Sequence, residues 1–372
     1  MKIAFTAPMK PLDDPVPSGD RTMGRLIVRA LEARGHDVRI ASRFRAWRQD
    51  GAELPAARDV ARAEAERIAA AWQAEDYRPD LFLTYHLYHK APDWVGPSLC
   101  DHFDIPYAII EASRAPKRRT GPWAFGFAEA DAALMRADAV AALHRADAEC
   151  LAEVLPQDRL QVLPPFLDAA PFRQAATADR ASGGPARLLA VGMMRAGDKQ
   201  HSYRVLADSL KEIMDLDWTI TLVGDGPARD PILSHFPPER VRWLGALAPE
   251  ALPAVYAGHD LLAWPAIREA FGFVFLEAQA AGLAVAGGAT FGVPDIVRDG
   301  VTGLLSPEGD VAAFAASLRR LISDGALRRT MGLAAARHIA EAHDLDAGAR
   351  RVECLLTTAL ARFKSGRGQG ER

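Results

Sequence analysis

Two glutamates, Glu269 and Glu277, stand eight positions apart in the segment REAFGFVFLEAQAAGLAVAG. Glu277 lies within an apolar stretch that we expect in a core, where a carboxylate is costly unless a polar group pairs with it. At 3.6 residues per turn, positions eight apart differ by about 80° around a helix, so one continuous helix face does not carry both. A carboxylate accepts hydrogen bonds from two adjacent hydroxyls, and the pair therefore predicts two diol-binding groups. The alternative is that Glu277 extends its carboxylate to solvent or pairs with an arginine of the core.

The residues around this pair divide the segment into a strand, a loop and a helix. The strand LLAWP ends before a loop, and Gly272 lets the backbone come close to a ligand. We expect a helix from about Phe273, with Glu269 on the loop and Glu277 in the first turns of the helix. A helix N-terminus has unpaired N–H groups and a positive dipole end, which favour phosphate. A sugar diphosphate lying there would reach Glu269 with its sugar hydroxyls and Glu277 with its ribose hydroxyls.

The elements that position this segment alternate between strand and helix. Short apolar runs predict strands at residues 2–7, 38–41, 81–85, 107–110, 139–143 and 160–163, then at 188–191, 219–223, 241–244, 261–263 and 283–286. Helical periodicity predicts helices at residues 22–34, 59–73, 145–154, 203–214, 311–322 and 327–343. This alternation is typical of parallel sheets with right-handed crossovers. The predicted fold is therefore α/β, with two doubly wound Rossmann-like domains that face each other across a ligand-binding cleft.

A change in composition separates the two halves. The segment RQAATADRASGGPA, residues 173–186, is polar, small and Gly-containing, which is typical of a linker. The predicted domains are therefore residues 1–172 and 187–346.

The stretch PAIREAFGFVFLEAQAAGLAV, followed by GVPDIVRDGVTGLL, resembles the donor-binding signature of retaining glycosyltransferases of family 4 (glycosyl transferases group 1). The shared elements are the E-x7-E pair, the EA-x-x-x-G helix and the G-x-x-[DE]-I-V-x-D-G-x-x-G-x-L tail, and the resemblance covers most of residues 187–345. It implies the GT-B fold, in which the C-terminal domain binds a nucleotide diphosphate sugar and the N-terminal domain binds the acceptor. It also implies that residues 347–372 form a helix that crosses back to the first domain and ends in a polar tail.

The resemblance gives donor-side roles to individual residues. Relatives carry an arginine directly after the glycine that ends strand RLLAV, and a Lys-Gly pair a few residues on; here Met193 and Gln200 replace the arginine and the second glycine. Lys199 keeps the position of the phosphate lysine, and Arg195 is the candidate substitute for the arginine. Two such cations would neutralise a diphosphate without a metal ion. Glu269 is the predicted catalytic group on the donor sugar, and the predicted donor-binding residues are Gly19, Arg195, Lys199, Phe271, Gly272, Phe273 and Glu277.

The N-terminal half supplies two further features. Gly19, in the loop PSGDR, stands where relatives have a glycine-rich loop that meets the diphosphate; the alternative is a simple turn. The resemblance also places a catalytic histidine near the end of strand LFLTY, which favours His86 over His89. Glu111 and Ser113, in IIEAS, stand where many relatives carry a histidine. This departure indicates a distinct acceptor pocket, or none.

The composition of the chain restricts the functions that it can have. The chain has 372 residues and a formal net charge of −3, without the bulk basic charge that nucleic-acid binding favours. The three cysteines are far apart and no metal-ligand cluster is visible, so we expect neither a metal nor a cofactor beyond the donor substrate. MKIAFTAP predicts a strand rather than a leader, which favours a cytoplasmic location. The basic segments RAPKRR and FRAWR favour solvated loops or, alternatively, a peripheral contact with an anionic acceptor at the inner face of a membrane.

The predicted function is transfer of a sugar from a UDP- or GDP-sugar to a glycan, lipid-linked or small-molecule acceptor, with retention of configuration. Such an enzyme would act in polysaccharide or lipopolysaccharide biosynthesis. Two alternatives remain open: a catalytically silent carbohydrate-binding or scaffold protein of the same fold, and an epimerase or hydrolase acting on the nucleotide sugar alone.

Overall fold

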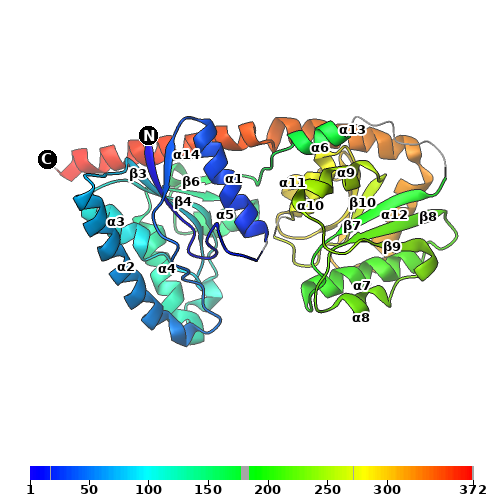
Figure 1. Cartoon of the computed structure of the whole chain (residues 1–372), viewed down its shortest axis with the longest axis horizontal. Helices are drawn as coiled ribbons and strands as arrows, with labels where there is room; N and C mark the ends of the chain where they lie inside the picture. The colour runs from blue at the N-terminus through cyan, green and yellow to red at the C-terminus, as the bar shows by residue number, and fades with distance from the viewer. Residues whose placement is uncertain (17, 177–183, 271, 371–372) are drawn as a thin grey trace. The chain divides into compact units, whose positions relative to one another are not determined.

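The computed structural model describes residues 1–16, 18–176, 184–270 and 272–370, and it divides into two compact units (Figure 1). The first unit contains Met1–Pro165 together with Leu345–Arg372, and the second contains Phe166–Asp344. Residues 166–172, which the sequence analysis places in the first domain, thus cluster with the second unit. Most of the predicted linker, residues 177–183, lies outside the described residues. We describe each unit by itself.

The first unit contains a six-stranded parallel sheet in the order β2-β1-β3-β4-β5-β6. Its strands are β1 (Lys2–Thr6), β2 (Asp37–Ile40), β3 (Leu81–Leu87), β4 (Tyr107–Ala112), β5 (Ala139–Ala142) and β6 (Leu160–Val162). Its helices are α1 (Gly19–Ala33), α2 (Leu54–Ala74), α3 (Val95–Phe103), α4 (Ala124–Arg136), α5 (Arg145–Ala152) and α14 (Leu345–Gly370). Ile3 pairs with both Val38 and Leu81, so the N-terminal strand lies inside the sheet.

Helices cover both faces of this sheet. Figure 1 shows α2, α3 and α4 on one side, and α1 with α14 on the other. The apolar stripe of α1 is buried, and the Ser18 side chain caps the helix by accepting a hydrogen bond from the Arg21 N–H. With both faces covered, β3 and β4 are buried along nearly their whole length, as their continuous apolar runs require.

The second unit contains a six-stranded parallel sheet in the order β12-β11-β10-β7-β8-β9. Its strands are β7 (Ala186–Val191), β8 (Trp218–Val223), β9 (Val241–Trp243), β10 (Leu261–Trp264), β11 (Ala284–Ala289) and β12 (Gly303–Pro307). Its helices are α6 (Ala170–Ala175), α7 (Asp198–Lys211), α8 (Arg229–Leu233), α9 (Leu252–Ala257), α10 (Phe273–Ala280), α11 (Val293–Ile296), α12 (Val311–Ser323) and α13 (Gly325–Ala342). The prediction of an α/β fold with two doubly wound sheets is confirmed.

Several elements differ from the expectation. Strand β12 was not predicted, because VTGLLSP offers only two adjacent leucines between polar and turn-forming residues. The helix α7 begins at Asp198, five residues before the predicted start, and so includes Lys199 in its first turn. Within the described residues, no helix is both long and apolar enough to cross a membrane.

Candidate functional site

In the second sheet β7 and β10 are neighbours. From β7 the chain continues to β8 and β9 on one side, and from β10 it continues to β11 and β12 on the other, so the strand order reverses between β7 and β10. Ligands of doubly wound sheets bind outside the carboxyl ends of the strands at such a reversal. The loops that follow these two strands line a cavity of about 350 Å³, formed by Arg195, Ala196, Gly197, Asp198, Lys199, Ile267, Arg268 and Glu269. A larger cavity of about 610 Å³ lies along β8 and β9, but it contains none of the predicted site residues. We therefore take the smaller cavity as the candidate donor site.

An ion pair crosses this cavity. Lys199, in the first turn of α7, pairs through Nζ with the Glu269 carboxylate on the loop after β10, and both side chains are mostly buried. The Lys199 ammonium also lies 5.3 Å from the centre of the Trp264 ring. The Trp264 indole Nε1–H donates to Glu269 Oε2 over 3.4 Å. The structure thus brings together two of the predicted residues, from segments 70 positions apart.

The loop that carries Glu269 has an unusual backbone. Ala266 and Arg268 have φ values of 55° and 48°, in the left-handed region, which costs about 1–3 kcal/mol per non-glycine residue. One hydrogen bond holds the loop, because the Ile267 N–H donates to Ser202 Oγ over 3.0 Å. The loop also lies close to Gly288, where the Cβ of any side chain would come within 1.8 Å of the Pro265 carbonyl oxygen. Such strain is concentrated at functional sites, because the surrounding structure has to maintain it.

Glu277 lies in the second turn of α10, as expected from the helix start at Phe273. Its Oε2 accepts a hydrogen bond of 2.7 Å from the hydroxyl of Tyr256, a fully buried residue on α9. Among the described residues, no arginine forms an ion pair with Glu277, so the polar partner is this tyrosine. Burial raises the pKa of Glu277, and the Tyr256 hydrogen bond opposes the increase only in part. The partly exposed carboxylate therefore keeps one oxygen fixed and can offer the other to a ligand.

The remaining donor-side residues occupy different environments. Arg195 is exposed and lines the cavity, whereas Met193, at the position of the family arginine, is a 42% exposed apolar side chain outside the cavity lining. Gly272 has a φ of 68° and directly precedes α10, where a side chain would crowd Glu269 and Phe275. Phe271 lies outside the described residues. The donor-binding roles of all these residues stay predictions.

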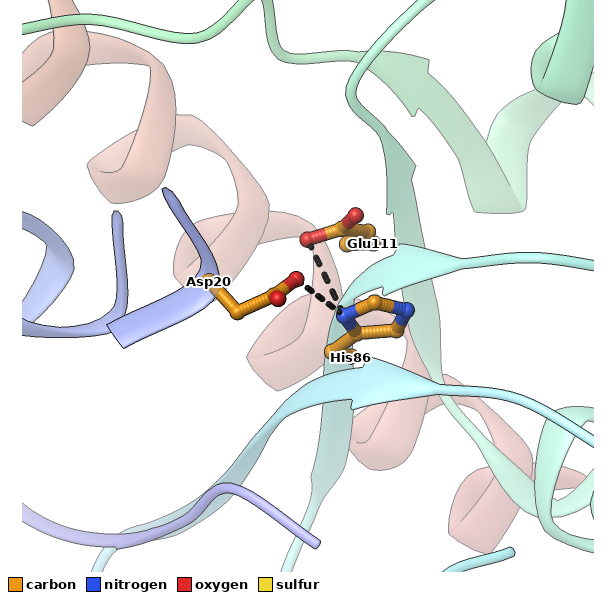
Figure 2. A group of neighbouring side chains, drawn as sticks. All are labelled: Asp20, His86 and Glu111. Carbon is orange, nitrogen blue, oxygen red and sulfur yellow. Dashed lines mark hydrogen bonds and ion pairs between the residues drawn. The ribbon is translucent and has the colours of Figure 1, made fainter. Parts of the chain in front are cut away.

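A second group of functional side chains lies at the carboxyl ends of strands in the first unit (Figure 2). Asp20 comes from the first turn of α1, His86 from the end of β3 and Glu111 from the end of β4. His86 Nδ1 is 3.1 Å from Asp20 Oδ1 and 3.7 Å from Glu111 Oε2. His86 and Glu111 both have left-handed backbones, with φ values of 66° and 62°. Gly19, which begins α1, directly precedes Asp20.

Charge governs the protonation of this group. Burial lowers the pKa of His86, but the negative charges of Glu111 and Asp20 outweigh burial and raise it to about 9. Burial raises the pKa of Glu111 to about 7, against the attraction of His86. Burial also acts to raise the pKa of Asp20, but its hydrogen bond to His86 and the charge of that residue hold the pKa below its ordinary value. At neutral pH, His86 is therefore a cation between two acids, of which Asp20 is ionised.

His89, the second histidine of the segment, lies in a different environment. It is 2% exposed, and its ring packs at 5.5 Å against that of Trp123. Neither ring nitrogen has a hydrogen-bond partner within the part of the chain that the structure describes. Burial, together with the charges of Arg118, Lys90 and Lys117, lowers the pKa of His89 to about 4. This histidine is thus a neutral side chain within a packed aromatic cluster.

The basic segments are partly engaged in local contacts. Arg114 forms a two-pronged hydrogen bond with Asp131, and the Arg45 guanidinium lies 4.9 Å from the centre of the Trp47 ring. An anionic partner for this surface stays a prediction.

The sequence could not identify every residue of these two groups. Tyr256 and Trp264 had no motif that linked them to the glutamates, and Asp20 and Glu111 become neighbours only when α1 and β4 meet the end of β3. A carboxylate inside a buried strand was the one available signal for Glu111, because such a group needs a polar partner.

Part of the second unit is similar to known proteins. Residues 185–324 match the family model of glycosyl transferases group 1, so this part carries the sequence pattern of that family. The D-inositol 3-phosphate glycosyltransferase of Corynebacterium diphtheriae is 34% identical over 145 residues, which are 37% of this chain and 34% of that protein. The protein of the same name from Salinispora arenicola is 43% identical over 100 residues, or 27% of this chain and 22% of that protein. The matched part is therefore only about a third or less of each relative.

Solved structures support the fold over nearly the whole chain. Sucrose-phosphate synthase from Thermosynechococcus elongatus superposes with a TM-score of 0.75 at 19% identity, covering 97% of this chain and 99% of that one. The HepE protein of Anabaena in complex with UDP gives a TM-score of 0.72 at 16% identity, covering 96% and 100%. These similarities confirm the GT-B fold expected from the sequence.

Proposed function

We propose that the protein is a glycosyltransferase whose second unit binds a nucleotide diphosphate sugar and whose first unit binds the acceptor. The observation that carries this proposal is the arrangement of Lys199 and Glu269 across one cavity at the strand-order reversal, with the Glu277 carboxylate on the helix that follows. A cation for a phosphate and two carboxylates for hydroxyls are the groups that such a donor requires. The solved HepE structures hold UDP and UDP-glucose on the same fold, which supports a UDP-sugar as the donor.

The proposed roles follow from the chemistry of the side chains. Lys199 and Arg195, with the helix start at Gly272, hold the diphosphate and need no metal ion there. Glu277 accepts hydrogen bonds from the ribose hydroxyls, and Glu269 accepts them from the hydroxyls of the donor sugar. The first unit receives the acceptor at the carboxyl ends of its strands, where His86 lies.

Transfer with retention completes the proposal. The acceptor oxygen forms a bond to the anomeric carbon on the face from which the diphosphate leaves. The bond between that carbon and the diphosphate oxygen breaks, its electron pair leaves with the diphosphate, and the diphosphate takes the proton of the acceptor hydroxyl. The protein contributes mainly by positioning the reactants and by stabilising the charge of the leaving group.

Thermal stability in the presence of nucleotides tests the donor proposal. A ligand at 100 times its dissociation constant stabilises the folded state by about 2.7 kcal/mol, which raises Tm by several degrees in a domain of this size. We expect UDP or GDP, and more strongly one of their sugar conjugates, to give this shift. Lys199→Met should remove most of it. Lys211→Met is the matched control, because Lys211 stands exposed at the other end of the same helix.

Product analysis then distinguishes the three activities. Transfer to an added acceptor, with the product configuration read by NMR, supports the proposal when the new linkage keeps the donor's configuration. Release of free sugar that no acceptor diverts would identify a hydrolase. Absence of a Tm shift with every nucleotide sugar tested, or equal effects of Lys199→Met and Lys211→Met, would refute the donor site.

A further inference from the structure

The Asp20–His86–Glu111 cluster gathers three groups that can ligate a metal from three separate elements of the first unit. Figure 2 shows both carboxylates pointing toward the same ring nitrogen, His86 Nδ1. One oxygen or nitrogen atom from each residue lies within 4.8 Å of the other two. Positions 20, 86 and 111 are far apart in the chain, so their spacing does not indicate this arrangement.

A second observation points to a ligand. Glu111 is 8% exposed, and its buried Oε2 forms an ion pair with His86 Nδ1 over 3.7 Å but has no hydrogen-bond partner among the described residues. A buried carboxylate oxygen with no hydrogen bond is costly, and such exceptions call for a specific explanation. The three side chains also contain two carboxylates for a single imidazole, so a cation at their centre would satisfy a charge that His86 alone cannot balance.

The spacing suits a metal ion. An ion at the centre of a triangle with these separations would lie within about 2.4 Å of all three atoms, close to the bond lengths of divalent cations to oxygen and nitrogen. One imidazole with two carboxylates is a mixed donor set that favours a transition-metal ion over Mg²⁺ or Ca²⁺, which prefer oxygen alone. His86 would bind through Nδ1, the atom on which both carboxylates converge, and the ion would displace the proton that this nitrogen carries at neutral pH.

We propose that Asp20, His86 and Glu111 form a binding site for a divalent transition-metal ion in the first unit. The ion ties the first turn of α1 to the ends of β3 and β4, and it fixes the orientation of the His86 ring. This inference goes beyond the proposed glycosyl transfer. His86 also lies where the acceptor is proposed to bind, but the test below needs neither acceptor nor nucleotide, so the two proposals can fail separately.

Manganese binding to the full chain tests the proposal. After treatment with a chelator, the protein is titrated with Mn²⁺, and the loss of the free Mn²⁺ signal in electron paramagnetic resonance reports binding. We expect one saturable site per chain, for which Zn²⁺ competes better than Mg²⁺. Asp20→Asn and Glu111→Gln should each weaken the Mn²⁺ affinity by about tenfold or more. Glu66→Gln, which changes an exposed carboxylate on α2, should leave the affinity unchanged.

Three results would overturn the proposal: no saturable Mn²⁺ binding, an affinity that neither ligand substitution changes, or binding that occurs only with a nucleoside diphosphate present. The last result would place the ion on the diphosphate instead. Circular dichroism shows whether each variant folds. Should Glu111→Gln fail to fold, Asp20→Asn decides the question, because the Asp20 side chain is one-third exposed and its replacement leaves no buried gap.

Discussion

Replacing Glu277 by glutamine should weaken nucleotide binding without weakening the fold. Glutamine has the same shape, and its side-chain oxygen can still accept the 2.7 Å hydrogen bond from Tyr256. Because burial raises the pKa of Glu277, the charged carboxylate costs folding free energy that a neutral amide does not. We therefore expect the unfolding free energy of Glu277→Gln to equal or exceed that of the original protein.

The loss of affinity follows from the other carboxylate oxygen. In glutamine an NH₂ group takes its place, and this group cannot accept a hydrogen bond from a ribose hydroxyl. A hydrogen bond to a charged group contributes about 1.5–3 kcal/mol, so the dissociation constant of the nucleoside diphosphate should rise about 10- to 150-fold. Isothermal titration calorimetry measures this change, and Glu250→Gln, an exposed carboxylate of the same unit, is the matched control.

A 2′-deoxy nucleotide sharpens the test. If Glu277 binds the ribose diol, the original protein should lose affinity for the 2′-deoxy nucleotide, whereas Glu277→Gln should lose little more. Equal losses for the two proteins would show that Glu277 does not contact the ribose, and the proposed role would be wrong. Tyr256→Phe completes the series: it removes a buried hydrogen-bond donor to the carboxylate, and the unfolding free energy should fall by about 1–2 kcal/mol.

Three further substitutions test other parts of the structure. Glu269→Gln should lower turnover at least tenfold while changing nucleoside diphosphate affinity less, as steady-state kinetics and calorimetry would show; normal turnover would contradict its role at the donor sugar. Because the pKa of His89 is lowered to about 4, the unfolding free energy should fall by up to about 3 kcal/mol as pH drops from about 6.5 towards 4, and denaturant titrations of His89→Phe should lose that dependence. Gly288→Ala should destabilise the second unit by about 2 kcal/mol or more, since the new Cβ meets the Pro265 carbonyl; an unchanged Tm would show that the loop can move.

Local patterns predicted the strand, loop and helix around Glu269 and Glu277 well, because their signals lie close together in the chain. Gly272 before an apolar run determined the start of α10, and that start places Glu269 on a loop and Glu277 in the helix. The same reasoning could not identify Tyr256, which is 21 positions from Glu277 on another helix. A single tyrosine in an apolar segment predicts burial, and only the packing of α9 against α10 turns it into a hydrogen-bond donor for the carboxylate.

The first unit shows more clearly what sequence patterns cannot predict. The alternation of apolar runs predicted β3 and β4, but periodicity does not show that β4 lies beside β3 or that α1 begins at their ends. The left-handed backbone of Glu111 also has no signal in the sequence, and that of His86 has only the weak preference of histidine for this region. The prediction of no metal-ligand cluster rested on spacing along the chain, and such spacing says nothing about side chains that three separate elements bring together, such as Asp20, His86 and Glu111.

The ion pair between Lys199 and Glu269 restricts how a donor could bind. Both residues are proposed to contact the donor, yet in the structure they are partners of each other. A diphosphate brings more negative charge to Lys199 than the Glu269 carboxylate does, so replacing Glu269 by the diphosphate as the partner of Lys199 is favourable. A free sugar offers only neutral hydroxyls and cannot compete with the Lys199 ammonium for Glu269. Binding of the diphosphate must therefore release Glu269 before this carboxylate can hold the sugar, which couples recognition of the sugar to the phosphate that carries it.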